Sequence, residues 1–332
     1  MIIPKRPIFS KATVFRRLTI NPDGQPSGIN ASASDAQHGS GPQTGGLPDV
    51  PAASELFDGE AFRRLRDSRE LAAFVEELRA REAQVAERTE SITRDSLLRA
   101  YAGIIADDLS KVGLAVPVAA YSDAASLFEA VTSLPFSPRT AKVRRKAREV
   151  ARVVMLSEKG ELRVPVRVDE VSALWEQAMC GEPRWSADYP SSTFRTGGMV
   201  ITGGGLEHKV LHRCIDPSEM PPWLERLIEM LADESLAPEL RAACGLGLYD
   251  CVHPFVDGNG HTGRLLMLAV LNSRYTQPTL VCLSHELVMN RSATMRQFAR
   301  LRGREADATG FCLGLLGQLK DAQERAMDVF AQ

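Results

Sequence analysis

Apolar residues recur every three to four positions through much of this chain, which is the period of an amphipathic helix. The clearest case is residues 60–88, where dense charge of both signs separates the apolar positions. Those positions are Phe62, Leu65, Leu71, Phe74 and Leu78, and only the step to Leu71 is wider. The pattern predicts an amphipathic helix or a helix pair within residues 58–112. Such a helix either packs onto the rest of the protein or binds a regulatory partner.

Further helices are predicted along the remaining chain, so the fold is expected to be mainly α. Their ranges are 122–134, 141–156, 169–179, 223–232, 239–252, 262–275, 286–301 and 307–330. Residues 162–168 alternate instead, with three valines on one face, and predict a short strand. Pro165 in the middle of that strand would confine it to a sheet edge. No internal repeat is visible.

The first 54 residues lack this periodicity. Residues 21–54 are rich in Gly, Ser, Pro, Asp and Gln, which predicts a disordered tail. Residues 1–20 carry five basic side chains and no acid, but they lack the long apolar core of a secretory signal. The tail fits a plain flexible extension, and it also fits the export signal of a bacterial effector delivered into a host cell. We expect three parts: tail 1–54, helical region 55–160 and a domain 161–332.

Composition and charge narrow the class of protein. The 332 residues are 44% hydrophobic and 25% charged, with a formal net charge of -2. This balance is ordinary for a soluble protein and makes nucleic acid an unexpected partner. The cations within residues 142–152 are interpreted as a solvated helix face, and the alternative is a grip on nucleic acid or an acidic partner.

The cysteines and the apolar runs indicate the compartment. Six cysteines without a C-x-x-C motif suit buried reduced thiols better than zinc ligands or disulfides. No run reaches the roughly 18 apolar residues of a membrane span. A cytoplasmic protein without a membrane partner is therefore expected, and homo-oligomerisation is left open.

The densest chemistry lies in the segment His-Pro-Phe-Val-Asp-Gly-Asn-Gly-His-Thr-Gly-Arg at residues 253–264. Gly258, Asn259 and Gly260 can turn their backbone amides toward one point, and an apolar helical run follows them. An amide nest at a helix N-terminus favours a phosphate, because the helix dipole adds to the free amides. Arg264, about one turn into that helix, can donate two hydrogen bonds to a phosphate.

Two other side chains of this segment complete the expected chemistry. Asp257 offers a hard oxygen ligand for Mg²⁺, which usually takes one or two carboxylates together with substrate phosphates. His253 ordinarily titrates near neutral pH, as a general base for a hydroxyl requires. The segment therefore predicts chemistry at a nucleotide phosphate.

Three other interpretations of this segment agree less well with the sequence. The string Gly258-x-Gly260-x-x-Gly263 matches a dinucleotide-binding fingerprint, but that fingerprint needs a preceding strand, and a helix is predicted there. A calcium loop starting at Asp257 would need glutamate at its twelfth position, where Leu268 stands. A simple turn with a buried histidine does not explain why base, carboxylate, nest and arginine occur together.

These residues resemble the motif of the Fic family, H-x-F-x-[D/E]-G-N-G-R-x-x-R. The matching positions are His253, Phe255, Asp257, Gly258, Asn259, Gly260 and Arg264. Histidine at position 261 replaces the first arginine of the motif. Residues 194–203 resemble the family's flap, a β-hairpin, and residues 220–224 resemble the start of its next helix. The resemblance covers roughly residues 168–332.

The resemblance implies a helical core with a short β-hairpin flap, and the transfer of AMP from ATP to a Ser, Thr or Tyr hydroxyl of a target protein. His253 would be the general base, and Asp257 would hold Mg²⁺. The amides of Gly258, Asn259 and Gly260, and the side chain of Asn259, would hold phosphates. Arg264 would bind the distal phosphate, and His261 would be a further phosphate-binding residue. The flap residues Arg195, Met199, Val200 and Ile201 would bind an extended target segment as an added strand.

His261 opens alternatives, because an imidazole is mostly uncharged at neutral pH and cannot donate a bidentate pair as a guanidinium does. One alternative is a Fic-type transferase with another donor, which would deliver UMP, phosphocholine or phosphate. Another is a catalytically weakened protein that only binds.

Many Fic proteins are inhibited by a helix with the pattern [S/T]-x-x-x-E-[G/N], whose glutamate pairs with the last arginine of the motif. Two imperfect matches occur here, one ending at Asp58 and one at Glu176. We predict that neither is functional and that the chain has no intact internal inhibitor.

Overall fold

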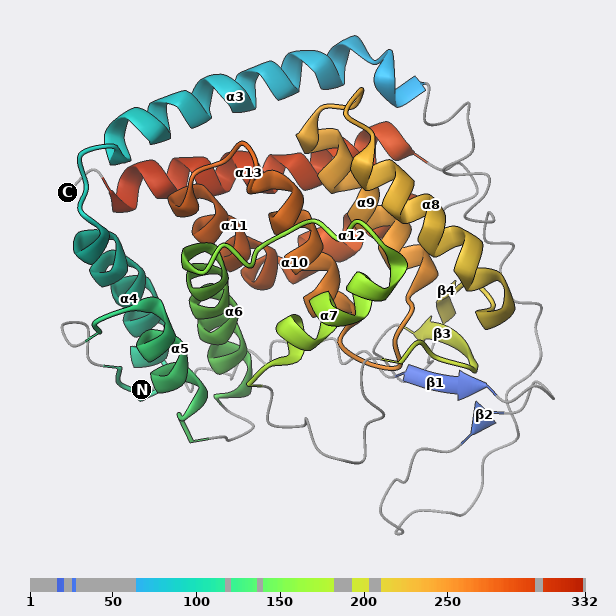
Figure 1. Cartoon of the computed structure of the whole chain (residues 1–332), viewed down its shortest axis with the longest axis horizontal. Helices are drawn as coiled ribbons and strands as arrows, with labels where there is room; N and C mark the ends of the chain where they lie inside the picture. The colour runs from blue at the N-terminus through green and yellow to red at the C-terminus, as the bar shows by residue number, and fades with distance from the viewer. Residues whose placement is uncertain are drawn as a thin grey trace, which may run out of the picture.

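The computed structural model describes residues 17–20, 26–27, 64–116, 121–135, 140–181, 193–202, 210–301 and 307–330. Within these ranges the protein is mostly helical (Figure 1), as predicted. The helices are α3 (Arg69–Thr89), α4 (Arg94–Ser110), α5 (Ala124–Thr132), α6 (Ala141–Glu158), α7 (Val168–Met179), η1 (Pro217–Glu219), α8 (Met220–Ala232), α9 (Pro238–Val252), α10 (Asn259–Leu271), α11 (Gln277–Met289), α12 (Arg291–Leu301) and α13 (Ala308–Val329). The strands are β1 (Arg17–Ile20), β2 (Pro26–Ser27), β3 (Gly198–Thr202) and β4 (Val210–Arg213).

Helices α9, α10 and α11 form the centre and are buried along nearly their whole length. Helix α9 packs on α8, α10 and α13, while α11 packs on α6 and α13. Helix α3 lies along α13 on the outside, and α5 covers α6 (Figure 1). Five cysteines are buried, Cys180 is exposed, and all six are free thiols, in line with the prediction. Among the residues described, no helix combines the length and the apolar character that a membrane span needs.

Two predicted elements are wrong. Residues 162–168 form no strand; they run irregularly, and α7 begins at Val168. The carbonyl of Leu162 accepts a hydrogen bond from the side chain of Asn272, so this segment is held by α10 rather than by a sheet. The predicted helix 286–301 is two helices, because α11 starts at Gln277 and ends before Asn290. Helix α11 is buried on all sides, so its sequence lacks the period that marks an amphipathic helix.

A buried carboxylate attaches α3 to the core. Glu82 accepts hydrogen bonds from the backbone N–H of Thr276 at 2.6 Å, from Thr279 Oγ1 at 2.8 Å and from Gln323 Nε2 at 3.0 Å. The acid therefore caps the start of α11, where a negative charge is favourable. Of the two interpretations of the amphipathic segment, packing onto the protein is the confirmed one.

Four basic side chains of α6 are buried. At these positions the predicted solvated helix face is wrong, and so is the alternative of a surface that grips nucleic acid or an acidic partner. Arg144, Lys146, Arg148 and Arg152 are each no more than 3% exposed. Their respective partners are the carbonyl of Thr132, the carboxylate of Asp108, and the carbonyls of Gly181 and Cys180. Carbonyls at the C-terminal end of a helix carry partial negative charge, so the three arginines stabilise the ends of α5 and α7.

A small sheet with the strand order β2-β1-β3-β4 lies beside the helices (Figure 1). Strand β1 pairs antiparallel with β3, placing Leu18 opposite Val200 and Thr19 opposite Met199. The prediction of a disordered tail is wrong for β1 and β2, because β1 pairs through its backbone with the hairpin strand β3 and with β2. The remainder of residues 1–54 lies outside the described ranges.

Candidate functional site

Helix α9 ends at His253, whose backbone is left-handed with a φ of 49°. Pro254 explains the stop, because a proline disfavours the helical conformation of the residue before it. His253 is the one non-glycine residue with a positive φ among those described, and such a conformation is costly unless the surroundings impose it. The imidazole is 5% exposed, and its Nδ1 lies 3.9 Å from Asp250 Oδ1. Local strain therefore fixes where this side chain points.

The loop between α9 and α10 is held by Asn259. The side-chain Nδ2 of Asn259 donates to the carbonyl of Phe255 at 2.6 Å, and its Oδ1 accepts from the backbone N–H of Phe255 at 3.0 Å. Both ends of the amide are thus engaged within the loop, and the side chain is 2% exposed. The side chain therefore shapes the loop, and its binding of phosphate stays a prediction, as does that of its backbone amide.

Aromatic packing holds the other face of the loop. The Phe255 ring packs between Trp175 at 5.3 Å and Phe194 at 5.4 Å, measured between ring centroids. Trp175 Nε1 also donates to the carbonyl of Asp257 at 2.8 Å. Helix α7 therefore positions the backbone directly before Gly258.

Gly258 begins α10 in the left-handed conformation, with a φ of 82°. A Cβ at this position would lie 2.6 Å from Trp175 Nε1 and 2.7 Å from Met179 Sδ, so only glycine fits. Among the described residues no hydrogen-bond acceptor is recorded for the backbone N–H groups of Asn259 and Gly260. These two amides lie at the first turn of α10, where the predicted anion nest would use them.

Arg264 and His261 converge on a carboxylate that the motif does not contain. Arg264 Nε donates to Glu149 Oε2 at 2.8 Å, and Arg264 Nη2 donates to Glu149 Oε1 at 2.5 Å. His261 Nδ1 lies 2.8 Å from Glu149 Oε1. Burial alone would raise the pKa of Glu149, but the charges of Arg264 and His261 outweigh burial and lower that pKa below its ordinary value. The predicted phosphate ligand Arg264 is thus occupied by an acid from α6.

The prediction that the chain has no intact internal inhibitor concerns activity and stays a prediction, and the Glu149 segment does not match the inhibitory pattern. Arg145 stands where that pattern requires Ser or Thr, and Val150 stands where it requires Gly or Asn. Of the two pattern matches considered, Glu176 is exposed on α7 and Asp58 lies outside the described residues. A different signal was present: Glu149 is the sole acid between residues 141 and 157, a stretch otherwise rich in cations.

Asp257 is half-buried directly before the nest, and its Oδ1 accepts from the backbone N–H of Gly258 at 2.6 Å. No group of three or more His, Cys, Asp or Glu side chains suited to a metal occurs in the described parts of the chain. A lone carboxylate beside an anion nest fits Mg²⁺, which takes its other ligands from substrate phosphates and water. It does not fit zinc, which needs three or four protein ligands.

The flap residues are placed differently from the prediction. Arg195 is 3% exposed and donates to the carbonyls of His253 and Gly197, each at 2.8 Å, of Val252 at 3.1 Å, and of Ile215. Burial lowers the pKa of this guanidinium. In this structure Arg195 joins the base of the flap to the turn at His253, and its role as a target ligand stays a prediction. Met199 is also buried, against Cys214, so its side chain offers the target no surface.

Val200 and Ile201 lie in β3, which has β4 on one side and β1 on the other. The edge that was expected to receive a target segment is paired with the chain's own β1. A target that adds a strand here has to displace Arg17–Ile20 first.

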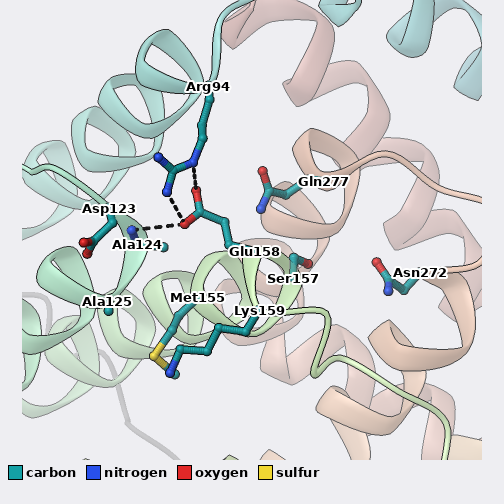
Figure 2. A pocket seen from close by; sticks show the side chains of 10 residues that line it. All are labelled: Arg94, Asp123, Ala124, Ala125, Met155, Ser157, Glu158, Lys159, Asn272 and Gln277. Carbon is teal, nitrogen blue, oxygen red and sulfur yellow. Dashed lines mark hydrogen bonds and ion pairs between the residues drawn. The ribbon is translucent and has the colours of Figure 1, made fainter.

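A cavity of about 690 Å³ lies at the other ends of α6 and α10 (Figure 2). Its lining includes the ion pair of Arg94 with Glu158, and Glu158 also accepts from the backbone N–H of Ala124. Asn272, which follows α10, lines the cavity, whereas the nest lies at the start of α10. A helix of 13 residues is about 20 Å long, so this cavity is separate from the candidate site.

Comparisons with known proteins agree with this geometry. Residues 174–271 match the sequence profile of the Fic/DOC family, a span that includes the whole segment from His253 to Arg264. The fold is similar to that of a Fic family protein from Desulfovibrio desulfuricans G20, with 19% identity and a TM-score of 0.53, over 78% of this chain and 75% of that one.

A fragment of Fic-1 from C. elegans is also similar, with 15% identity and a TM-score of 0.50, over 83% of this chain and 79% of that one. At such identities the likeness concerns the fold. No curated protein matches the chain.

Proposed function

Because this chain carries a Fic/DOC family domain over residues 174–271, we propose that it is a protein adenylyltransferase. In the proposed reaction, AMP passes from ATP to a Ser, Thr or Tyr hydroxyl of a target protein. The observation that carries the proposal is the order of groups around one turn. A strained, buried histidine ends α9, and two unoccupied amides and an arginine open α10 directly after it.

The chain's residues divide the chemistry as follows. Nδ1 of His253 faces Asp250, so we assign the proton of the target hydroxyl to Nε2. The hydroxyl oxygen then forms a bond to the α-phosphorus, and the bond from that phosphorus to the bridging oxygen breaks, releasing pyrophosphate. The amides of Asn259 and Gly260 stabilise the charge on the phosphate oxygens. Asp257 would hold Mg²⁺ together with the donor's phosphates, and the cation would neutralise part of their charge.

In the described conformation the donor site is closed. Glu149 occupies both donating nitrogens of Arg264 that would meet the distal phosphate. Binding of a nucleoside triphosphate therefore requires the Glu149 carboxylate to move away from Arg264. A low basal activity is expected, because only the open fraction of the molecules binds the donor.

The test is mass spectrometry of the purified protein incubated with Mg²⁺ and, separately, with ATP, GTP, CTP or UTP. Self-labelling by one adenosine monophosphate with ATP is the expected result. Labelling by uridine monophosphate would show that this group, and not AMP, is transferred. The same holds for phosphocholine or phosphate when the matching donors are supplied. Donor binding without labelling of the protein or of any target would favour a Fic-fold binding protein. These alternatives remain because position 261 is a histidine, which supplies less positive charge than the arginine of the family motif.

Pairing of β1 with the flap makes a separate prediction. Replacing both Leu18 and Thr19 by proline is expected to open β3, because one of two successive N–H groups must face β3 and proline lacks that group. Hydrogen exchange of the amides in β3 should then accelerate by about tenfold or more. Unchanged exchange in α9 serves as the control for an intact fold, and unchanged exchange in β3 would show that β1 does not cover it.

A further inference from the structure

The surroundings of Glu149 hold more positive charge than one carboxylate requires. Arg264 and His261 contact it directly. Arg145 lies four residues earlier on α6, and residues four apart share one face of a helix. Arg145 therefore lies on the same face of α6 as Glu149, although it makes no ion pair with that acid. A terminal phosphate, with up to two negative charges, matches these three basic side chains better than a carboxylate does.

Arg145 differs from the other cations of α6. The four buried ones donate to helix ends or to Asp108, as described above. Arg145 is half-buried, and within the described residues it has no hydrogen-bond or ion-pair partner. Its Nε is enclosed by protein without an acceptor. A buried guanidinium nitrogen without an acceptor is costly, so a ligand that supplies one would be favoured.

The direction of α6 places Arg145 toward the nest. Glu149 of α6 meets the first turns of α10, and Leu162, shortly after α6, meets Asn272 at the end of α10. The two helices therefore run in the same direction. Four residues correspond to about 6 Å along α6, so moving from Glu149 to Arg145 leads to the level of the Asn259 and Gly260 amides.

We infer that Arg145 is a donor-binding residue, which meets the terminal phosphate of a nucleoside triphosphate beside Arg264 once Glu149 has moved away. This inference rests on the proposed function and adds a contact to it. Arg145 would supply a permanent charge, which His261 lacks at neutral pH. Arg145 would contribute to the binding of a nucleoside triphosphate but not of a monophosphate, because the single phosphate does not extend to Arg264.

The experiment measures nucleotide affinity by calorimetry in a Glu149→Ala background, where the site is open. ATP and AMP with Mg²⁺ are the first probes, and UTP and UMP the second. Adding Arg145→Ala is expected to lower the affinity for ATP by about tenfold or more, because a charge-assisted contact to the terminal phosphate is lost. The affinity for AMP, which has no such phosphate, should not change. Arg145→Lys should restore part of the affinity for ATP.

Lys159→Ala is the matched control, since it removes one exposed positive charge after the far end of α6. If Arg145→Ala lowered the affinities for ATP and AMP equally, or lowered neither, the inference would be overturned and the proposed function would remain intact. Failure of the Glu149→Ala protein with intact Arg145 to bind any nucleoside triphosphate would refute the proposed function, and this inference with it.

Discussion

Replacing Glu149 by alanine is expected to raise the rate of nucleotide transfer about ten- to a hundredfold, because the donor no longer has to break a buried ion pair. Breaking such a pair costs about 3–5 kcal/mol when a charge is left unpaired and less when a phosphate replaces the partner, and each 1.4 kcal/mol is a factor of ten. The carboxylate holds Arg264 through two hydrogen bonds and also contacts His261. Without it, the distal phosphate meets a free guanidinium. Alanine preserves the helix, since it is the most favourable helix residue. The measurement is the initial rate of labelling at saturating Mg²⁺.

The matched control is Glu176→Ala. Glu176 is the acid that the inhibitory sequence pattern points to, but it is exposed on α7. We expect no change in rate from that substitution. The opposite outcome, with activation by Glu176→Ala and none by Glu149→Ala, would show that the ion pair with Arg264 does not limit donor binding.

Acidity does not release Glu149 near neutral pH. Its pKa is lowered in the folded protein, so its contribution to stability is complete above the ordinary glutamate pKa and is lost only as the pH falls toward the lowered value. The ion pair with Arg264 is therefore expected to persist through the physiological range. Displacement of Glu149 must come from the donor or from a partner.

Replacing His253 by alanine is expected to lower the rate of transfer by about a hundred- to ten-thousandfold, the usual contribution of a general base. Nucleotide affinity should remain, because the Asn259 and Gly260 amides and Arg264 lie on α10. Labelling by mass spectrometry and binding by calorimetry together separate the two effects. A rate within tenfold of the unmodified chain would place the base elsewhere.

A second variant controls for backbone strain at this position. His253 has a φ of 49°, which alanine adopts at some cost, whereas asparagine tolerates it. His253→Asn should therefore fold as well as the parent and be as inactive as His253→Ala. If the asparagine variant were active and the alanine variant inactive, the imidazole would be needed for loop geometry rather than for proton transfer.

Features that depend on residues close together in the chain were predictable from sequence. The helical period marked most helices, although α11 was missed because it is buried on all sides and has no polar face. The turn between α9 and α10 was predictable from the His253-Pro254 pair and from the glycine at position 258. The types of residue in that turn also indicated the base, the carboxylate and the anion nest.

Contacts between distant residues were decided by the tertiary structure. Glu149 reaches Arg264 across 115 positions, and no local pattern records such a pair. Arg195 was predicted to bind a target and the arginines of α6 to face solvent, because the sequence does not show the helix ends and carbonyls that surround these side chains in the fold. The sequence does not show that the Asn259 side chain holds the loop, because its hydrogen bonds to the backbone of Phe255 form only in the folded protein.

The sequence by itself therefore determined the mainly helical fold and the chemical groups of the candidate site, since each depends on a local period or a short motif. The tertiary structure decided the state of that site: Arg264 held by Glu149, and the flap edge covered by β1. Burial and charge pairing join segments that are far apart in the chain, and that is the physical reason the closed state could be seen only in the folded protein.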